Sequence, residues 1–193
     1  MIATFPPNVK RWTFDQFLNI AEMGFFDENP HVELIDGVIH EKMPQKHPHF
    51  FSVSMLNAAL KGIYGAESAI SVQSTVRLSS LDGPEPDIAL FRGAMNDYRK
   101  GFPDASDLTL VIEVGDTSLG DDKRDEAPLY ARFAVPEFWI VDVRGRRILV
   151  HRSPQPETLS WGEIFEVKEG ESVAPLGRSE TISVADILPD FAA

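Results

Sequence analysis

The feature that most restricts the fold is a pair of short, almost entirely apolar segments separated by a helical one. Residues 108–114 read LTLVIEV, and residues 138–143 read FWIVDV. Such runs are typical of strands that are covered on both faces of a sheet. Residues 122–133 are predicted to form a helix between them in spite of Pro128. We therefore expect an α/β fold, with a central mixed sheet flanked by helices.

Further elements are predicted around this unit. A capping box of Thr13 and Gln16 begins a helix over residues 14–23. Asp36 and Gly37 form a two-residue turn of type I′, in which both residues need a positive φ. Strands are predicted at 31–35, 38–43, 69–78, 88–91 and 148–151, a second long helix at 49–64, a hairpin within 161–167 and a short helix at 184–188. No repeat or linker divides residues 1–193, so we expect a single domain.

Composition excludes several classes of protein. Eighteen Lys and Arg against thirty Asp and Glu give a net charge of −12, which argues against a protein that coats nucleic acid. The absence of cysteine excludes disulfides, thiolate metal sites and a cysteine nucleophile, so any metal must bind through oxygen or imidazole. Residues 1–10 lack the apolar run of a signal peptide, and no segment approaches the roughly 20 apolar residues of a membrane span. We expect a cytoplasmic protein without a membrane partner.

Two carboxylates stand where an acid is costly to bury. Asp87 directly precedes the apolar segment at 88–91, and Glu113 lies near the end of the strand predicted at 108–114. A buried carboxylate needs a partner or a cation. If the two strands are neighbours, the carboxylates converge and suit a hard cation such as Mg²⁺ or Mn²⁺. The alternative is that each acid ends a strand or pairs with an arginine at the surface.

An ordered set of short motifs extends over most of the chain. It consists of VELIDG at 32–37, PD at 86–87, IEV at 112–114, DTS at 116–118, LYAR at 129–132 and VPEFWIVD at 135–142. In this order, from about residue 33 to residue 188, the set resembles the Uma-two family of restriction-endonuclease-like proteins in the PD-(D/E)XK nuclease superfamily. The resemblance implies a restriction-endonuclease-like core, in which acidic residues hold a divalent metal for phosphodiester hydrolysis.

The resemblance also implies roles for individual residues. Asp87 matches the aspartate of the PD element and Glu113 the acidic residue of the (D/E)XK element, so both are expected to bind Mg²⁺ or Mn²⁺. Glu33 matches an acidic residue of the opening hairpin, which would orient the attacking water or bind a second metal. The implied function is an endonuclease that acts on nucleic acid, DNA in the first place, through a metal that polarises the phosphate and activates a water.

The lysine of the pattern is displaced. The residue two positions after Glu113 is glycine; in the family that the chain resembles, the lysine lies on the following helix, four residues before the tyrosine that matches Tyr130. That position is Glu126 here. Lys123 is the expected replacement because residues three apart share a helix face, and Arg124 is its neighbour. Otherwise Lys123 belongs to a solvated charged face, and the site binds metal without cutting.

Other residues are secondary candidates. His47 and His49 stand at the start of the second predicted helix, as ligands, proton shuttles or structural residues. Ser118 lacks a group to activate it as a nucleophile and is better suited to capping a helix. One basic cluster either contacts phosphate or offsets nearby acids. It comprises Arg144, Arg146, Arg147 and Arg152.

Three functions stay open at the level of sequence. The first is the metal-dependent nuclease. The second is a catalytically silent binding or regulatory module of the same fold, which Glu126 and the negative net charge favour. The third is a hydrolase of a small phosphoester, because the same acids would serve it. A homodimer is expected only because symmetric pairs are common.

Overall fold

The structure is a computed structural model that describes residues 9–26, 31–115 and 121–191, with the backbone alone for residues 121–125. Its helices are α1 (Phe14–Glu22), α2 (His47–Tyr64) and α3 (Asp121–Arg132), with 3-10 helices η1 (Met95–Tyr98), η2 (Ala105–Asp107) and η3 (Ala185–Ile187). Its strands are β1 (Val32–Ile35), β2 (Val38–Glu41), β3 (Ser68–Val72), β4 (Ile88–Arg92), β5 (Leu108–Gly115), β6 (Glu137–Asp142), β7 (Arg147–Gln155), β8 (Ser160–Lys168), β9 (Ser172–Val173) and β10 (Ile182–Ser183). No described helix has the length and apolarity needed to cross a lipid bilayer.

Within the described chain, six strands form the central sheet in the order β3-β4-β5-β6-β7-β8. Neighbouring strands are antiparallel except β5 and β6, which run parallel. A parallel pair cannot be joined by a tight turn, and α3 lies in the connection between these two strands. The α/β prediction, with a mixed sheet flanked by helices, is confirmed.

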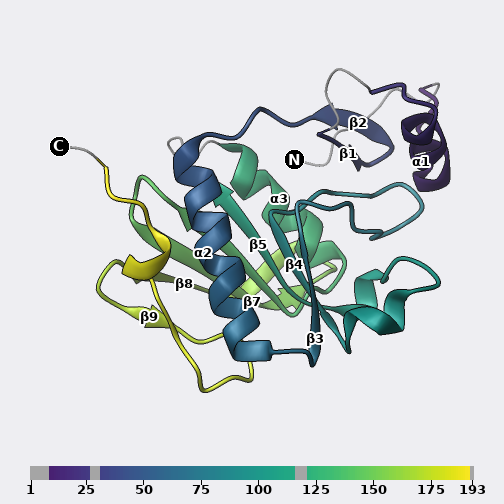
Figure 1. Cartoon of the computed structure of the whole chain (residues 1–193). Coiled ribbons are helices and arrows are strands. Elements are labelled where there is room, and N and C mark those ends of the chain that lie inside the picture. Colours follow the sequence, from purple (N-terminus) through teal and green to yellow (C-terminus); the bar gives the residue numbers. More distant parts are fainter. Residues whose placement is uncertain (1–8, 27–30, 116–120, 192–193) are drawn as a thin grey trace.

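The two faces of the sheet are covered by different elements. The long helix α2 crosses one face, with the C-terminal segment beside it, and α3 lies behind the sheet (Figure 1). Alternation along β5 and β6 fills both layers: Ile112 and Trp139 pack on the α2 side, whereas Val111 and Phe138 pack on the α3 side. Both aromatic residues are fully buried, as their apolar segment predicts.

A smaller unit lies at one end of the sheet, where α1 packs on the β1–β2 hairpin (Figure 1). Its apolar core is Phe14, Phe17, Val32 and Leu34. Leu34 and Gly83 exchange two backbone hydrogen bonds, of 3.1 and 2.7 Å, which bind the hairpin to the loop before β4. A Cβ at Gly83 would lie 2.6 Å from the Phe14 ring, so this approach requires glycine.

The local signals for α1 and the hairpin are confirmed in detail. The Thr13 hydroxyl accepts from the Gln16 backbone N–H, and the Gln16 side chain accepts from the Thr13 N–H. Asp36 and Gly37 have φ values of 54° and 74°, as a type I′ turn requires. The turn at Asp36 and Gly37 sets the register of β1 on β2, in which Ile35 is opposite Val38.

A strand prediction and a hairpin prediction were wrong, and the strand predicted at 148–151 is longer, at Arg147–Gln155. The strand predicted over 69–78 ends at Val72, because Gln73 takes a positive φ of 47° and the next residues fold back, with Val76 N–H donating to the Pro84 carbonyl. The segment 161–167 is not a hairpin but the middle of β8, which pairs with β7. The chain turns earlier, at 156–159, where Leu159 has a φ of 55°.

Candidate active site

Asp87 and Glu113 lie side by side because of the register between β4 and β5. Ile88 is opposite Ile112 in this antiparallel pair, so the preceding residue, Asp87, is adjacent to Glu113. Each residue is only 1% exposed. The Val114 backbone N–H donates to Asp87 Oδ2 at 2.8 Å, which fastens the first carboxylate to the strand that carries the second. The register therefore brings the two residues to adjacent positions on paired strands, as convergence of their carboxylates would require.

Glu113 faces the helix α3, where it meets a buried phenol. The Tyr130 hydroxyl donates to Glu113 Oε1 at 3.1 Å. Burial, together with the carboxylates of Glu113, Glu126 and Glu33, raises the pKa of the Tyr130 phenol well above its usual value. Tyr130 is therefore a neutral hydrogen-bond donor, and it lies among carboxylates from three separate elements.

Glu33 reaches this site from the hairpin. Val32 and Leu34 on either side of it enter the apolar core, so the alternation of β1 turns Glu33 to the opposite face. The Glu85 backbone N–H donates to Glu33 Oε2 at 3.2 Å, and Lys42 Nζ lies 3.7 Å from the same oxygen. The hairpin is thus connected to the loop that carries Asp87.

Lys42 and Glu85 are part of this site although the sequence analysis did not single them out. Lys42 follows β2, and its ammonium donates to the Glu85 carbonyl. Glu85 is 8% exposed; burial raises the pKa of its carboxyl, while His31, whose Nδ1 lies 3.1 Å from Oε1, and Lys42 act in the opposite direction. The position of Glu85, two residues before Asp87, is the signal that could have identified it.

His49 is the second of the two histidines considered above, and it contacts Asp87. Its Nε2 lies 3.0 Å from Asp87 Oδ1, and the residue is 7% exposed. His47 is exposed at the first turn of α2. Of the two candidates, only His49 is brought to the acidic site.

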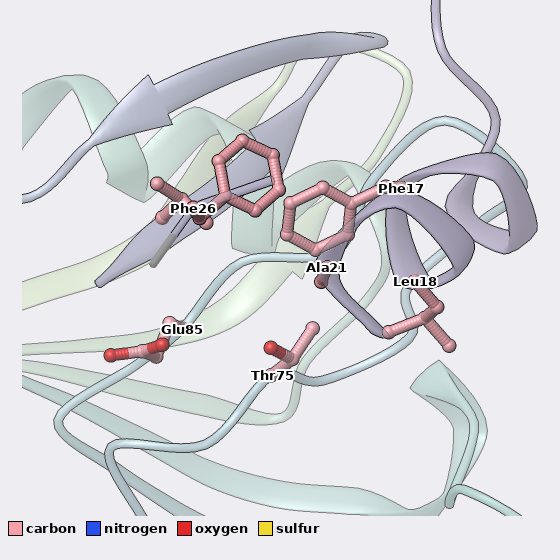
Figure 2. A pocket seen from close by; sticks show the side chains of 7 residues that line it. Phe17, Leu18, Ala21, Phe26, Thr75 and Glu85 are labelled. Atoms are coloured by element: carbon pink, nitrogen blue, oxygen red, sulfur yellow. The ribbon is translucent and has the colours of Figure 1, made fainter. Parts of the chain in front are cut away.

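A pocket of about 270 Å³ lies beside the site, between α1 and the loop before β4. In Figure 2 the rings of Phe17 and Phe26 face one another above Thr75 and Glu85. The pocket is also lined by Leu18, Ala21 and Val32. Its lining is apolar apart from Thr75 and Glu85, so Glu85 is the residue shared between the pocket and the acidic site.

The remaining sequence candidates fall in two groups. Lys123 lies on α3, but its side chain, like all of Ser118, is outside the described residues. The basic cluster is largely paired with acids: Arg146 binds Glu169, Arg147 binds Asp142 and Glu166, and Arg152 binds Glu137. Arg144 packs over the Phe191 ring at 4.3 Å. Of the two interpretations of this cluster, the pairing supports charge compensation.

The ligand atoms that the site offers are of the type that binds a hard divalent cation. Asp87, Glu113 and Glu33 offer carboxylate oxygens, the ligands that Mg²⁺ and Mn²⁺ prefer. The described residues do not include a group of three His, Asp or Glu side chains in metal-binding geometry. Mg²⁺ is usually held by one or two carboxylates, with waters and substrate phosphates completing its shell. The pair of Asp87 and Glu113 therefore fits such a site.

The structure is an α/β fold with a mixed six-stranded sheet, in which Asp87 and Glu113 occupy adjacent buried positions on two paired strands. Residues 14–191 match the model of the Uma2 family, which is described as "Putative restriction endonuclease", and the chain belongs to this family. The family inferred from the sequence motifs is confirmed.

One solved structure is similar over nearly the whole chain. It is described as "a putative nuclease belonging to DUF820 from Anabaena variabilis" and aligns with a TM-score of 0.69. The alignment covers 91% of this chain and 96% of that one at 16% sequence identity, so the likeness shows a shared fold. A search of the curated proteins finds no significant match.

Proposed function

We propose that this protein is a divalent-metal-dependent nuclease that hydrolyses phosphodiester bonds in nucleic acid, with DNA as the first substrate to test. The observation that carries the proposal is the register of β4 on β5, which sets Asp87 beside Glu113 in the buried sheet. Membership of a family described as "Putative restriction endonuclease" supports the same class of reaction.

In this proposal Asp87 and Glu113 hold Mg²⁺ or Mn²⁺. When bound, such a cation polarises a phosphate oxygen and lowers the pKa of a water at the site. Val114 N–H and His49 orient the Asp87 carboxylate, while the Tyr130 hydroxyl orients that of Glu113. These donors hold both carboxylates in one geometry before substrate arrives, which is how outer partners support metal ligands.

Glu33 has a different task from the two buried acids. Its side chain is 14% exposed and is held by the Glu85 N–H and by Lys42. A carboxylate that is partly accessible and fixed by one hydrogen bond and one ion pair is suited to orienting the attacking water and accepting its proton. We assign Glu33 this role, and we keep Lys123 as a proposed catalytic cation on α3.

A second function is supported by one specific observation. Glu126, at the position where the family pattern has lysine, is close enough to Tyr130 for its carboxylate to raise the phenol pKa. A negative charge at this place would weaken phosphate binding. The alternative is a catalytically silent module of the same fold that binds a partner, including a second copy of itself.

The test is cleavage of plasmid, single-stranded DNA and RNA with Mg²⁺ or Mn²⁺. We expect wild-type protein to cut at least one of these substrates, and EDTA to abolish cutting. Asp87→Asn and Glu113→Gln should lower the rate at least about 100-fold, since each removes a charge that the reaction uses. Glu33→Gln tests the proposed proton acceptor, and Lys123→Gln tests the proposed catalytic cation on α3; each should lower the cleavage rate.

Glu163→Gln is the matched control, because Glu163 is exposed on β8, at the edge of the sheet. It makes the same chemical change as Glu113→Gln and should leave the rate unchanged. If wild-type protein binds Mn²⁺ but cuts none of the substrates, the silent module is favoured. Equal rates in wild-type protein, Asp87→Asn and Glu113→Gln would refute the proposed site.

A further inference from the structure

The proposed site has an excess of negative charge around it. The carboxylates of Glu33, Glu113 and Glu126 all act on the Tyr130 phenol, and Asp87 lies next to Glu113. The chain as a whole has a net charge of −12. A nucleic acid backbone carries a negative charge at every phosphate, so its approach to this site requires local cations.

Three arginines of β7 and the turn before it bind acids other than those of the acidic site. Arg146, Arg147 and Arg152 are each paired with an acid of β6, β8 or the turn after β8. Lys42, in contrast, is among the described residues that contact the acidic site directly.

The hairpin register puts Lys42 on the face that carries Glu33. Glu33 is opposite His40, so the residue two positions beyond His40 is a diagonal neighbour of Glu33 on the same face. The Lys42 N–H donates to the His31 carbonyl at 2.9 Å, which continues the ladder past the end of β2. The type I′ turn thus sets the position of this lysine.

The ammonium group of Lys42 is held but not enclosed. It donates to the Glu85 carbonyl and lies 3.7 Å from Glu33 Oε2, and its side chain is 17% exposed. An ammonium group has three N–H donors and no acceptor, so it can contact a phosphate oxygen while it keeps its hydrogen bond to the Glu85 carbonyl. These contacts place a cation next to the carboxylate that we assign as the proton acceptor.

We propose that Lys42 binds a backbone phosphate of the substrate at the acidic site. This inference rests on the proposed function. It gives the contact with phosphate to Lys42 in the hairpin, whereas the family pattern has its lysine on the helix after β5. The structural alternative is that Lys42 only ties the hairpin to the loop of Glu85. Binding measured in the absence of cleavage separates the two.

The experiment follows fluorescence anisotropy of a labelled 20-nucleotide single strand and of its duplex, in Ca²⁺ and in EDTA, over a range of salt concentrations. Lys42→Gln keeps a donor for the Glu85 carbonyl but removes the charge; Lys42→Arg keeps the charge. Loss of one phosphate contact lowers the salt slope by about 0.9 for duplex DNA and about 0.7 for a single strand. We expect this loss in Lys42→Gln, and a slope like that of wild type in Lys42→Arg.

Lys61→Gln is the matched control, because Lys61 is exposed near the end of α2. It should leave both slope and affinity unchanged. In the Mg²⁺ cleavage assay, Lys42→Gln should lower the rate about 100-fold, comparable to the loss of one charge-stabilising donor, and Lys42→Arg should restore most of it. Thermal unfolding of each variant shows whether the fold is retained.

The outcomes separate the two proposals. If wild-type protein cuts and Lys42→Gln equals it in slope and rate, the Lys42 inference is overturned while the nuclease proposal stands. If wild-type protein binds without cutting and Lys42→Gln lowers the slope, Lys42 stands and the hydrolytic function fails. If Lys42→Arg is as impaired as Lys42→Gln, or if wild-type protein binds no nucleic acid, the Lys42 inference is overturned.

Discussion

His49 Nε2 lies 3.0 Å from Asp87 Oδ1, and this contact joins the N-terminal turn of α2 to the start of β4. A carboxylate accepts hydrogen bonds, so Nε2 must carry the hydrogen. Asp87 is then held on one oxygen by an imidazole and on the other by the Val114 N–H. His49 Nδ1 is buried and has no hydrogen-bond partner among the described atoms.

Removal of the imidazole should loosen Asp87 without unfolding the protein. Outer partners of metal-binding carboxylates typically contribute a factor of about 10–100 in metal affinity or activity. We expect His49→Ala to lower Mn²⁺ affinity, measured by calorimetry, within this range. His47→Ala, a change in the exposed neighbour, should have no effect, and an equal effect of both substitutions would contradict the role of His49.

Tyr130→Phe tests the donor on Glu113. The substitution keeps the ring, which packs 4.8 Å from Phe138, and removes only the hydroxyl that Glu113 Oε1 accepts from. A buried acceptor left without its donor costs about 1–3 kcal/mol. Urea unfolding should show a loss of this size. The pKa of the phenol is raised well above its usual value, so the phenol does not titrate between pH 6 and 9. The curve of cleavage rate against pH should therefore keep the same shape in Tyr130→Phe over this range.

Arg132 connects α3 to the hairpin and to the loop before β4. Its Nη2 lies 2.6 Å from Asp82 Oδ1, and its Nη1 lies 3.5 Å from Asp36 Oδ1. Asp82 is 3% exposed, so Arg132→Ala leaves a buried charge without its main partner. We expect a loss of about 3 kcal/mol in urea unfolding, the lower end of the range for such pairs because Arg132 is partly exposed. Lys168→Ala, which removes an exposed cation, should be indistinguishable from wild type.

The lowered pKa of His151 predicts how the free energy of unfolding depends on pH. Burial lowers the pKa of His151 below 6.5 in the folded state. Backbone hydrogen bonds with Phe138 and Leu149 raise the pKa but do not outweigh burial. Below pH 6.5 the unfolded chain therefore binds more protons than the folded one, and stability falls as pH decreases. Urea midpoints at pH 7.5 and 5.0 should differ less in His151→Gln than in wild type. A larger difference in the variant would contradict this assignment.

The parts of the fold that could be predicted are those in which local signals agree with the final packing. The capping box of Thr13 and Gln16 and the turn at Asp36 and Gly37 depend on neighbouring residues alone. The loop between β3 and β4 could not be predicted in this way, because its backbone pairs with distant partners. Leu34 with Gly83 is the main example, and the contact forms only when the hairpin docks on the loop.

The candidate site shows the same division. Asp87 and Glu113 are recognisable because one acid directly precedes an apolar strand and the other lies within one, but their partners come from other elements. His49 and Tyr130 reach them through helix packing, which no local pattern specifies. Lys42 is an intermediate case: the type I′ turn already implies that it shares a face with Glu33, but its contact with Glu85 depends on the docked loop.

The most direct test of the central claim is calorimetric titration of Mn²⁺ into wild-type protein, Asp87→Asn, Glu113→Gln and the control Glu163→Gln. The claim is that Asp87 and Glu113 together hold one divalent cation for hydrolysis. It predicts binding to wild-type protein and to Glu163→Gln, and a loss of at least about tenfold in affinity when either buried carboxylate becomes an amide. The same affinity in all four proteins would contradict the claim, because the two acids would then be structural residues of the sheet.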